Sequence, residues 1–185
     1  MGNKQHVRLL TFNALLIAII LVLTLVPNIG FIQIPPLSLT TIHIPVIIGA
    51  ILFGNRTSII LSLAFGLSSW FVASTRGAAT DLLFMNPLIS VLPRLLFGLS
   101  IPLLYHMIKI KNESLRIALV ALLSSIVHSF VVLVAICINL GLQGGLNVGL
   151  TVFLGAFFTL SIALEAVVAA LISVPVVMGL RRVVK

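Results

Sequence analysis

The chain has 185 residues, of which 61% are hydrophobic and 8% are charged, and its mean hydropathy is +1.33. This composition excludes a soluble domain and indicates an integral membrane protein, because no soluble core of this size needs so much apolar surface. The net charge of +8 does not indicate a nucleic-acid-binding protein, since the basic residues are scattered and no aromatic residues are interleaved with them.

Apolar segments predict an all-α protein with six membrane-spanning helices in a single transmembrane domain, residues 1–185. In chain order the predicted spans cover residues 7–26, 41–53, 57–74, 86–107, 115–140 and 148–180. We interpret the first as an uncleaved span, because no small-residue cleavage site follows it. The second is roughly 20 Å long at 1.5 Å per residue, too short for a core of about 30 Å, so we expect it to begin within the protein or to continue the preceding loop. The sixth is longer than a bilayer requires, and we expect it to tilt, to kink near Pro175 or to project outward.

The loops differ in charge, and this difference predicts the orientation. Residues 28–40 contain the adjacent Pro35 and Pro36 and are long enough for an ordered external loop. If both termini are cytoplasmic, the outer loops contain Arg76 as their only basic residue. The inner side then contains Lys4, Arg8, Arg56, Lys109, Lys111, Arg116, Arg181, Arg182 and Lys185. The positive-inside rule therefore predicts cytoplasmic N- and C-termini.

Arg94 is the basic residue that this pattern places inside a span. A charged side chain at that depth costs at least a few kcal/mol, roughly, on insertion scales. Pro87 and Pro93 lie in or beside the same helix, and backbone groups freed by proline are tolerated where they line a cavity or are buried in protein. A kinked helix whose arginine braces the bundle would explain these features. We favour a polar binding cavity with a cation directed into it, because other spans place polar groups at the same depth.

Five unusual residues from five spans form a predicted polar layer. Counted inward from the nearest inner basic residue at 1.5 Å per residue, they lie at roughly 18–24 Å depth. They are His43, Trp70, Arg94, His128 and Glu165. Each alone also fits a structural role: a core histidine, an interfacial tryptophan, or an Arg94–Glu165 ion pair. Together they predict a site for a small polar solute, open to the outside. Asn139, on the same helical face as His128, and Asn86 are further candidates.

Catalytic motifs are missing from the sequence. It contains no His-Glu-x-x-His, no Gly-x-Ser-x-Gly and no Walker A segment, so the chain is not expected to hydrolyse nucleotides by itself. The three acids, Asp81, Glu113 and Glu165, provide no paired carboxylates within the membrane. We therefore expect a non-enzyme without catalytic residues, metal or cofactor. An intramembrane hydrolase that uses Ser90 with His43 or His128 stays open as an alternative.

Several segments resemble the substrate-binding S components of energy-coupling factor (ECF) transporters. Ala14 and Ala18 lie on the inner half of the first span, where that family packs small residues against a transmembrane coupling protein. Small residues four apart let helices approach closely in lipid. More specific are residues 40–54 (TTIHIPVIIGAILFG), residues 66–70 (GLSSW) and the segment from Asn86-Pro87 to Pro93-Arg94. These are similar to the pantothenate-type branch, which is close to carriers of pyridoxine and hydroxymethylpyrimidine.

The resemblance implies a multi-pass protein of the bacterial cell membrane that binds a vitamin on its extracellular side, beneath residues 28–40 and 75–81. It also implies association with a coupling protein and two cytoplasmic ATPases, and toppling in the membrane to release the vitamin. The carboxylate of pantothenate would pair with Arg94, and its hydroxyl and amide groups would meet polar candidates. Those candidates are His43, Asn86, His128 and Asn139.

Two alternatives remain open from the sequence. Glu165 competes for Arg94, and a tight pair between them would favour a neutral or cationic vitamin such as pyridoxine. A stand-alone carrier of small solutes is the alternative from a different class of protein. The single Trp and single Tyr argue against large flat ligands, which usually need stacking surfaces.

Overall fold

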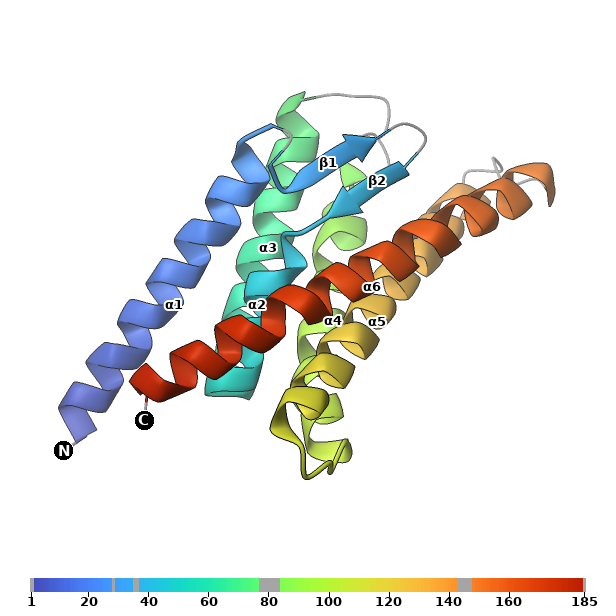
Figure 1. The fold of residues 1–185 in the computed structure, drawn as a ribbon. Helices are drawn as coiled ribbons and strands as arrows, with labels where there is room; N and C mark the ends of the chain where they lie inside the picture. The colour runs from blue at the N-terminus through green and yellow to red at the C-terminus, as the bar shows by residue number, and fades with distance from the viewer. Residues whose placement is uncertain (1, 28, 35–36, 77–83, 143–147, 185) are drawn as a thin grey trace.

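The computed structural model describes residues 2–27, 29–34, 37–76, 84–142 and 148–184, and shows six helices and a small hairpin (Figure 1). In chain order the elements are α1 (Gly2–Leu25), β1 (Phe31–Ile34), β2 (Leu37–Thr40), α2 (His43–Phe53), α3 (Asn55–Arg76), α4 (Pro87–Met107), α5 (Glu113–Leu142) and α6 (Val148–Val184). The six helices lie where the sequence predicts them. The hairpin is an additional element within the predicted ordered loop.

Five of the described helices are long and apolar enough to cross a membrane, which supports a multi-pass membrane protein. The exception is α2, with 11 residues, as expected from its short apolar segment. It is nonetheless the most deeply enclosed helix, and every side chain from His43 to Ile51 is buried. It therefore forms the centre around which the longer helices pack.

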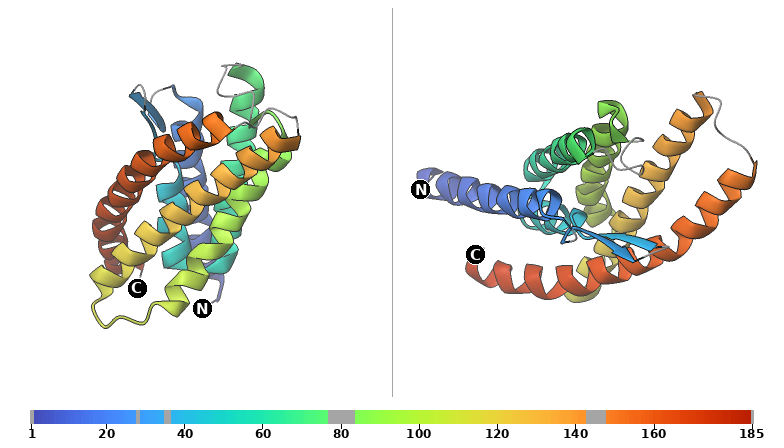
Figure 2. Two further views of the ribbon diagram at one scale, coloured as in Figure 1. Left: turned by 90° about the vertical axis from the view of Figure 1, so that its right-hand side faces the viewer. Right: turned by 90° about the horizontal axis from the view of Figure 1, so that it is seen from above.

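The longer helices surround α2, and the hairpin covers one end of the bundle. β1 and β2 are antiparallel, with Phe31 opposite Thr40 and Ile34 opposite Leu37. Seen from above, the hairpin lies between α1 and α6 (Figure 2). The beginning of α1 and the end of α6 lie at the other end of the molecule (Figure 1). The hairpin leads directly into α2, so it is positioned over the buried start of that helix.

Glycines allow α3 and α4 to approach closely. A Cβ atom at Gly98 would lie 2.4 Å from the Oγ of Ser62, and one at Gly66 would lie 3.0 Å from the Cα of Val91. Lipid provides no hydrophobic drive for helix association, so such backbone proximity and the dispersion contacts that it allows hold membrane helices together. The close contact fixes α4, which contains Arg94, against α3.

Pro102 in the interior of α4 leaves one backbone acceptor without its helical donor. Proline has no N–H, so the carbonyl four residues earlier, that of Gly98, loses its usual partner. The hydroxyl of Ser58 on α3 donates to this carbonyl at 2.6 Å, and Ser58 is fully buried. A side chain of the neighbouring helix thus satisfies the group that the proline frees.

Ser58→Ala is expected to destabilise the chain by about 1–3 kcal/mol, because it leaves the buried Gly98 carbonyl without a donor. The melting temperature in detergent measures this effect. Ser62→Ala is the matched control, since Ser62 is equally buried on the same helix but donates to Ile59 of its own helix, at 3.1 Å. A Ser58→Ala chain that melts no lower than Ser62→Ala would contradict the assignment.

A second polar network joins the helix ends remote from the hairpin. The Tyr105 hydroxyl donates to Glu113 at 2.7 Å and accepts from Arg181 at 2.7 Å, and Arg181 also bonds Glu113. The Arg116 guanidinium lies 3.8 Å from the centroid of the Tyr105 ring. These contacts tie the end of α4 to the start of α5 and the end of α6.

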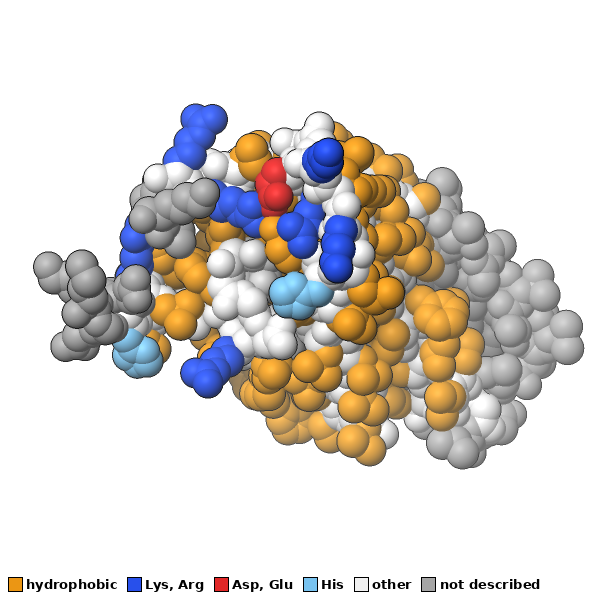
Figure 3. Space-filling model, turned by 90° about the horizontal axis from the view of Figure 1, so that it is seen from below, with side chains coloured by type: hydrophobic (Ala, Val, Ile, Leu, Met, Phe, Trp, Pro, Cys, Tyr) orange, Lys and Arg blue, Asp and Glu red, His pale blue; other side chains and the backbone are white. Residues whose placement is uncertain are grey.

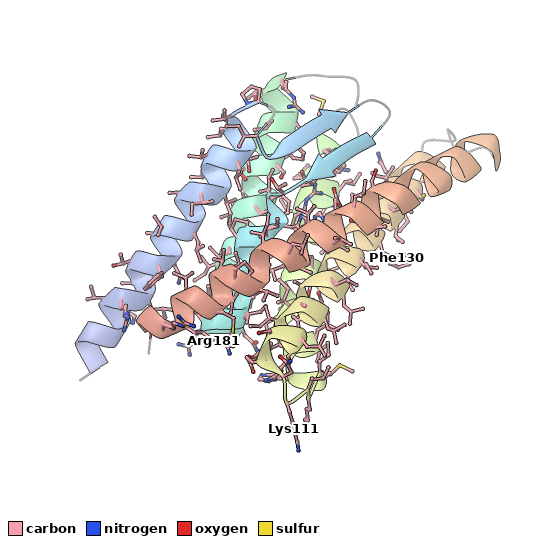
Figure 4. The ribbon with its side chains drawn as sticks, in the orientation of Figure 1. Lys111, Phe130 and Arg181 are labelled. Atoms are coloured by element: carbon pink, nitrogen blue, oxygen red, sulfur yellow. The ribbon has the colours of Figure 1, made fainter. Side chains whose placement is uncertain are left out.

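Basic side chains gather around an acidic patch on this face, with hydrophobic side chains flanking them (Figure 3). Arg181, near the end of α6, and Lys111, between α4 and α5, both lie at the end opposite the hairpin (Figure 4). The Phe130 side chain of α5 is 60% exposed on the apolar flank, as expected for a surface that faces lipid. The end of the bundle remote from the hairpin therefore presents basic side chains.

Candidate functional site

Arg94 is buried in the bundle, with 4% of its surface exposed. Pro93 precedes it and frees the carbonyl of Ile89, four residues before the proline. The Nη1 of Arg94 donates to this carbonyl at 3.1 Å, while its Nε is buried without a hydrogen-bond partner. The carbonyl freed by the proline thus orients the guanidinium. The Nε donor of the guanidinium remains unused.

Aromatic rings, rather than an acid, surround the charge of Arg94. Its Cζ atom lies 5.5 Å from the ring centroid of Phe65 and 5.0 Å from that of Phe84. A guanidinium within about 6 Å of an aromatic centroid gains a cation–π attraction. This attraction is weaker than a desolvated ion pair and leaves the positive charge available to an anion.

His43 of α2 and His128 of α5 stack on each other beside this cation. Their ring centroids are 5.3 Å apart and the planes differ by 12°. The Nε2 of His43 is 3.1 Å from the Oγ of Ser125, whereas neither ring nitrogen of His128 has a partner. Phe97 contacts the His128 ring edge-on, with centroids 4.9 Å apart. Buried polar atoms without partners are costly, so His128 is a group that a bound molecule would stabilise.

Glu165 of α6 is held by other groups than Arg94. Its Oε1 accepts from the backbone N–H of Thr40 at 2.6 Å, and its Oε2 accepts from the hydroxyl of Ser129 at 3.0 Å. No ion pair joins Glu165 to Arg94 within the described parts of the chain. The Arg94–Glu165 pair that the sequence left open is therefore not formed in the structure, and Glu165 instead ties the end of β2 to α5 and α6.

Asn86 and Asn139 lie apart from this cluster, on a groove between α4 and α5. The groove has a volume of about 300 Å³ and is otherwise apolar, with Leu92 and Val134 among its lining residues. The Oδ1 of Asn86 also accepts from the N–H of Leu88 at 3.0 Å and caps the start of α4. The structure thus brings these two asparagines to one surface, and His43, Arg94, His128 and Glu165 to a buried layer.

Trp70 lies outside the buried layer. Its side chain is 37% exposed, and its Nε1 donates to the carbonyl of Met85 at 3.0 Å. Met85 follows Phe84, whose ring contacts Arg94. Trp70 therefore holds the segment before α4 that contributes an aromatic contact to the cation.

The fluorescence of Trp70, the only tryptophan, is expected to change saturably when a ligand reaches Arg94. A ligand that displaces Phe84 from the guanidinium would move Met85 and alter the indole hydrogen bond. Emission of the purified chain, titrated with ligand, measures the change, and Trp70→Phe provides the blank. Unchanged emission at saturation, with binding shown by calorimetry, would contradict this coupling.

Several residues of the layer were not identified from the sequence. Phe65 and Phe97 enclose the histidines, and Ser125 and Ser129 bond His43 and Glu165. The serines carry a recognisable signal, because residues three and four apart share a helical face, and Ser125 lies three residues before His128 and four before Ser129. The phenylalanines carry none, since apolar aromatics occur throughout the membrane spans. No group of three or more potential metal ligands occurs among the described residues.

Ala14 and Ala18 lie exposed on α1, as a docking surface requires. The opposite face of the helix is buried through Asn13, Leu16 and Ile20. The bundle therefore leaves these two small residues accessible.

Comparison with known proteins finds one matching family and two similar proteins. A family model described as ECF transporter, substrate-specific component, matches residues 8–180. The pantothenate transporter PanT of Leuconostoc mesenteroides subsp. mesenteroides is 31% identical over 109 residues, which cover 56% of this chain and 53% of that protein. The pantothenic acid transporter PanT of Lactococcus lactis subsp. cremoris is 32% identical over 120 residues, which cover 57% of this chain and 60% of that protein.

The matched regions thus span a little over half of each relative. The family model, by contrast, covers nearly the whole of this chain. The chain therefore belongs to the family of substrate-specific components of ECF transporters, which are membrane subunits rather than enzymes.

Proposed function

We propose that this chain is the substrate-binding subunit of an ECF-type vitamin uptake transporter and that it binds pantothenate. The observation that carries the proposal is Arg94, a buried cation that no acid of the described chain neutralises. Pantothenate carries one carboxylate, and a guanidinium can bind a carboxylate through two parallel hydrogen bonds. The two relatives named as pantothenate transporters support this choice.

The vitamin enters from the outside of a bacterial cell membrane, at the end that the hairpin covers. The basic face at the other end, with Lys111 and Arg181, supports cytoplasmic termini. In this orientation α2 completes the sixth crossing together with the hairpin above it. The resemblance also implies that residues 75–81 cover the vitamin, but these residues lie largely outside the described parts of the chain.

Transport requires partners, because the chain has no nucleotide-binding motif. We propose a transmembrane coupling protein that packs on Ala14 and Ala18 of α1, and two cytoplasmic ATPases bound to it. Small exposed residues four apart support a close helix–helix contact there. After the whole subunit topples, the vitamin leaves on the cytoplasmic side.

Other vitamins fit the charges less well. Pyridoxine or hydroxymethylpyrimidine would provide no anion for Arg94, and the carboxyl of Glu165 already accepts from Thr40 and Ser129. A neutral or cationic vitamin would thus leave the cation without a counter-charge. The exposed docking surface on α1 likewise argues against a stand-alone carrier.

The test is a binding screen of the purified chain against water-soluble vitamins by calorimetry. We expect saturable binding of pantothenate and none of pyridoxine, hydroxymethylpyrimidine or riboflavin at the same concentration. Binding of another vitamin but not of pantothenate would overturn the proposal. Purification from native membranes tests the alternative of a stand-alone carrier. Such a carrier would not co-purify with a coupling protein and ATPases.

A further inference from the structure

Two opposite charges are buried in the same layer without pairing. Arg94 is on α4 and Glu165 is on α6, with exposed fractions of 4% and 8%. Opposite charges attract strongly in a medium of low dielectric constant, so an internal ion pair would be the simplest arrangement. The fold instead provides each with its own protein partners, Ile89 for the cation and Thr40 and Ser129 for the acid.

The remaining hydrogen-bonding capacity differs between the two sides. A guanidinium has five N–H donors, and Arg94 uses one of them on Ile89 while its buried Nε has no partner. A carboxylate can accept about four hydrogen bonds, and the described partners of Glu165, Thr40 and Ser129, do not use all of them. Spare donors therefore remain on the α4 side of the layer and spare acceptors on the α6 side.

His128 connects the two sides. Its ring and the Arg94 guanidinium both contact Phe65, at 5.6 Å and 5.5 Å from the ring centroid. The next residue, Ser129, donates to Glu165. The path from cation to acid thus passes along the unpartnered imidazole of α5. Along this series of contacts a donor is followed by a histidine and then by an acceptor.

We infer that Glu165 determines substrate specificity by accepting a hydrogen bond from a hydroxyl at the end of the substrate remote from its carboxylate. This inference rests on the proposed function and deepens it. Pantothenate has the required polarity, with its carboxylate at one end, an amide in the middle and two hydroxyl groups at the other end. Thr40 and Ser129 orient the acceptor, since each occupies one of its oxygens.

The experiment compares pantothenate with N-(3,3-dimethylbutanoyl)-β-alanine, the same acid with both hydroxyl groups replaced by hydrogen. Wild-type chain is expected to prefer pantothenate by about ten- to hundredfold in Kd, the range for a hydrogen bond to a charged group. Glu165→Gln retains a carbonyl acceptor without the charge, so the preference is expected to fall to a few-fold. Glu165→Met retains the side-chain length without an acceptor, so the preference is expected to vanish.

Two matched controls isolate the hydroxyl contact. Arg94→Gln is expected to weaken both compounds by the same factor and to leave the preference intact, because both carry the carboxylate. Ser129→Ala removes one partner of Glu165 but keeps its carboxyl group, so most of the preference is expected to remain. Affinities are measured on purified chain. Glu165→Gln alters the packing least, so it tests the inference alone if Glu165→Met fails to fold.

An unchanged preference for pantothenate in Glu165→Gln overturns the inference. An equal loss of affinity for both compounds also overturns it, because that is the result expected of a residue that only anchors the hairpin. Wild-type chain that binds both compounds equally also overturns it, while leaving the proposed function standing. Wild-type chain that binds neither compound contradicts the proposed function itself and the inference with it.

Discussion

Replacing Arg94 by alanine is expected to weaken pantothenate binding about thirtyfold or more while the chain keeps its fold. Removing one partner of a buried charged contact costs roughly 2–5 kcal/mol, and about 2 kcal/mol already corresponds to a thirtyfold change in Kd. The described partners of the guanidinium are one carbonyl and two aromatic rings, so no acid among the described residues shares its charge. Calorimetry and the melting temperature of the same purified sample measure both quantities.

Two further variants separate a ligand contact from a structural brace. Arg94→Lys retains the charge but not the planar fork, so it is expected to restore binding only in part. Glu165→Gln added to Arg94→Ala is expected not to raise the melting temperature, because the two side chains form no ion pair in the structure. A stable Arg94→Ala chain with unchanged affinity would refute the role of Arg94 in binding.

Replacing Ala14 or Ala18 by tryptophan is expected to abolish uptake by the assembled transporter, while the isolated chain still binds the vitamin. Both alanines are exposed, and the opposite face of α1, with Asn13, Leu16 and Ile20, holds the helix in the bundle. An indole at either position leaves the fold intact but prevents close contact with a second helix. Uptake of radiolabelled pantothenate into proteoliposomes that contain the full complex measures the loss.

Leu103→Trp is the matched control for this prediction. Leu103 lies on α4, is 60% exposed, and presents a lipid-facing surface remote in sequence from α1. The same bulky residue there is expected to leave uptake unchanged. Normal uptake by both alanine variants would eliminate the docking surface on α1.

The positions of the six helices could be predicted because apolar segments end at strong local signals. Pro27 follows α1, and Gly54, with a φ of 79°, separates α2 from α3. The hairpin was not predicted, since the adjacent prolines between its strands remove backbone donors and obscure the alternation typical of strands. An ordered loop was the most that this segment indicated.

The sequence predicts one level along the helices for the candidates of the polar layer, but it does not give the direction of each side chain. Counting residues along a helix axis gives depth, whereas the side that a residue faces depends on rotation by 100° per residue. Phe65 is fully buried, while Trp70, five residues later and about 140° around the helix, is 37% exposed. The partners of Glu165 depend on rotation in the same way, and Thr40 is contributed by the hairpin that the sequence did not indicate.

The central claim is that the buried Arg94 binds the carboxylate of the substrate. The affinities of wild-type chain for pantothenate and pantothenol, which has an alcohol in place of the carboxylate, test it most directly, because no substitution disturbs the fold. The claim predicts that pantothenate binds at least about thirtyfold more tightly, as expected for a buried charged contact. Equal affinity for the two compounds would contradict it.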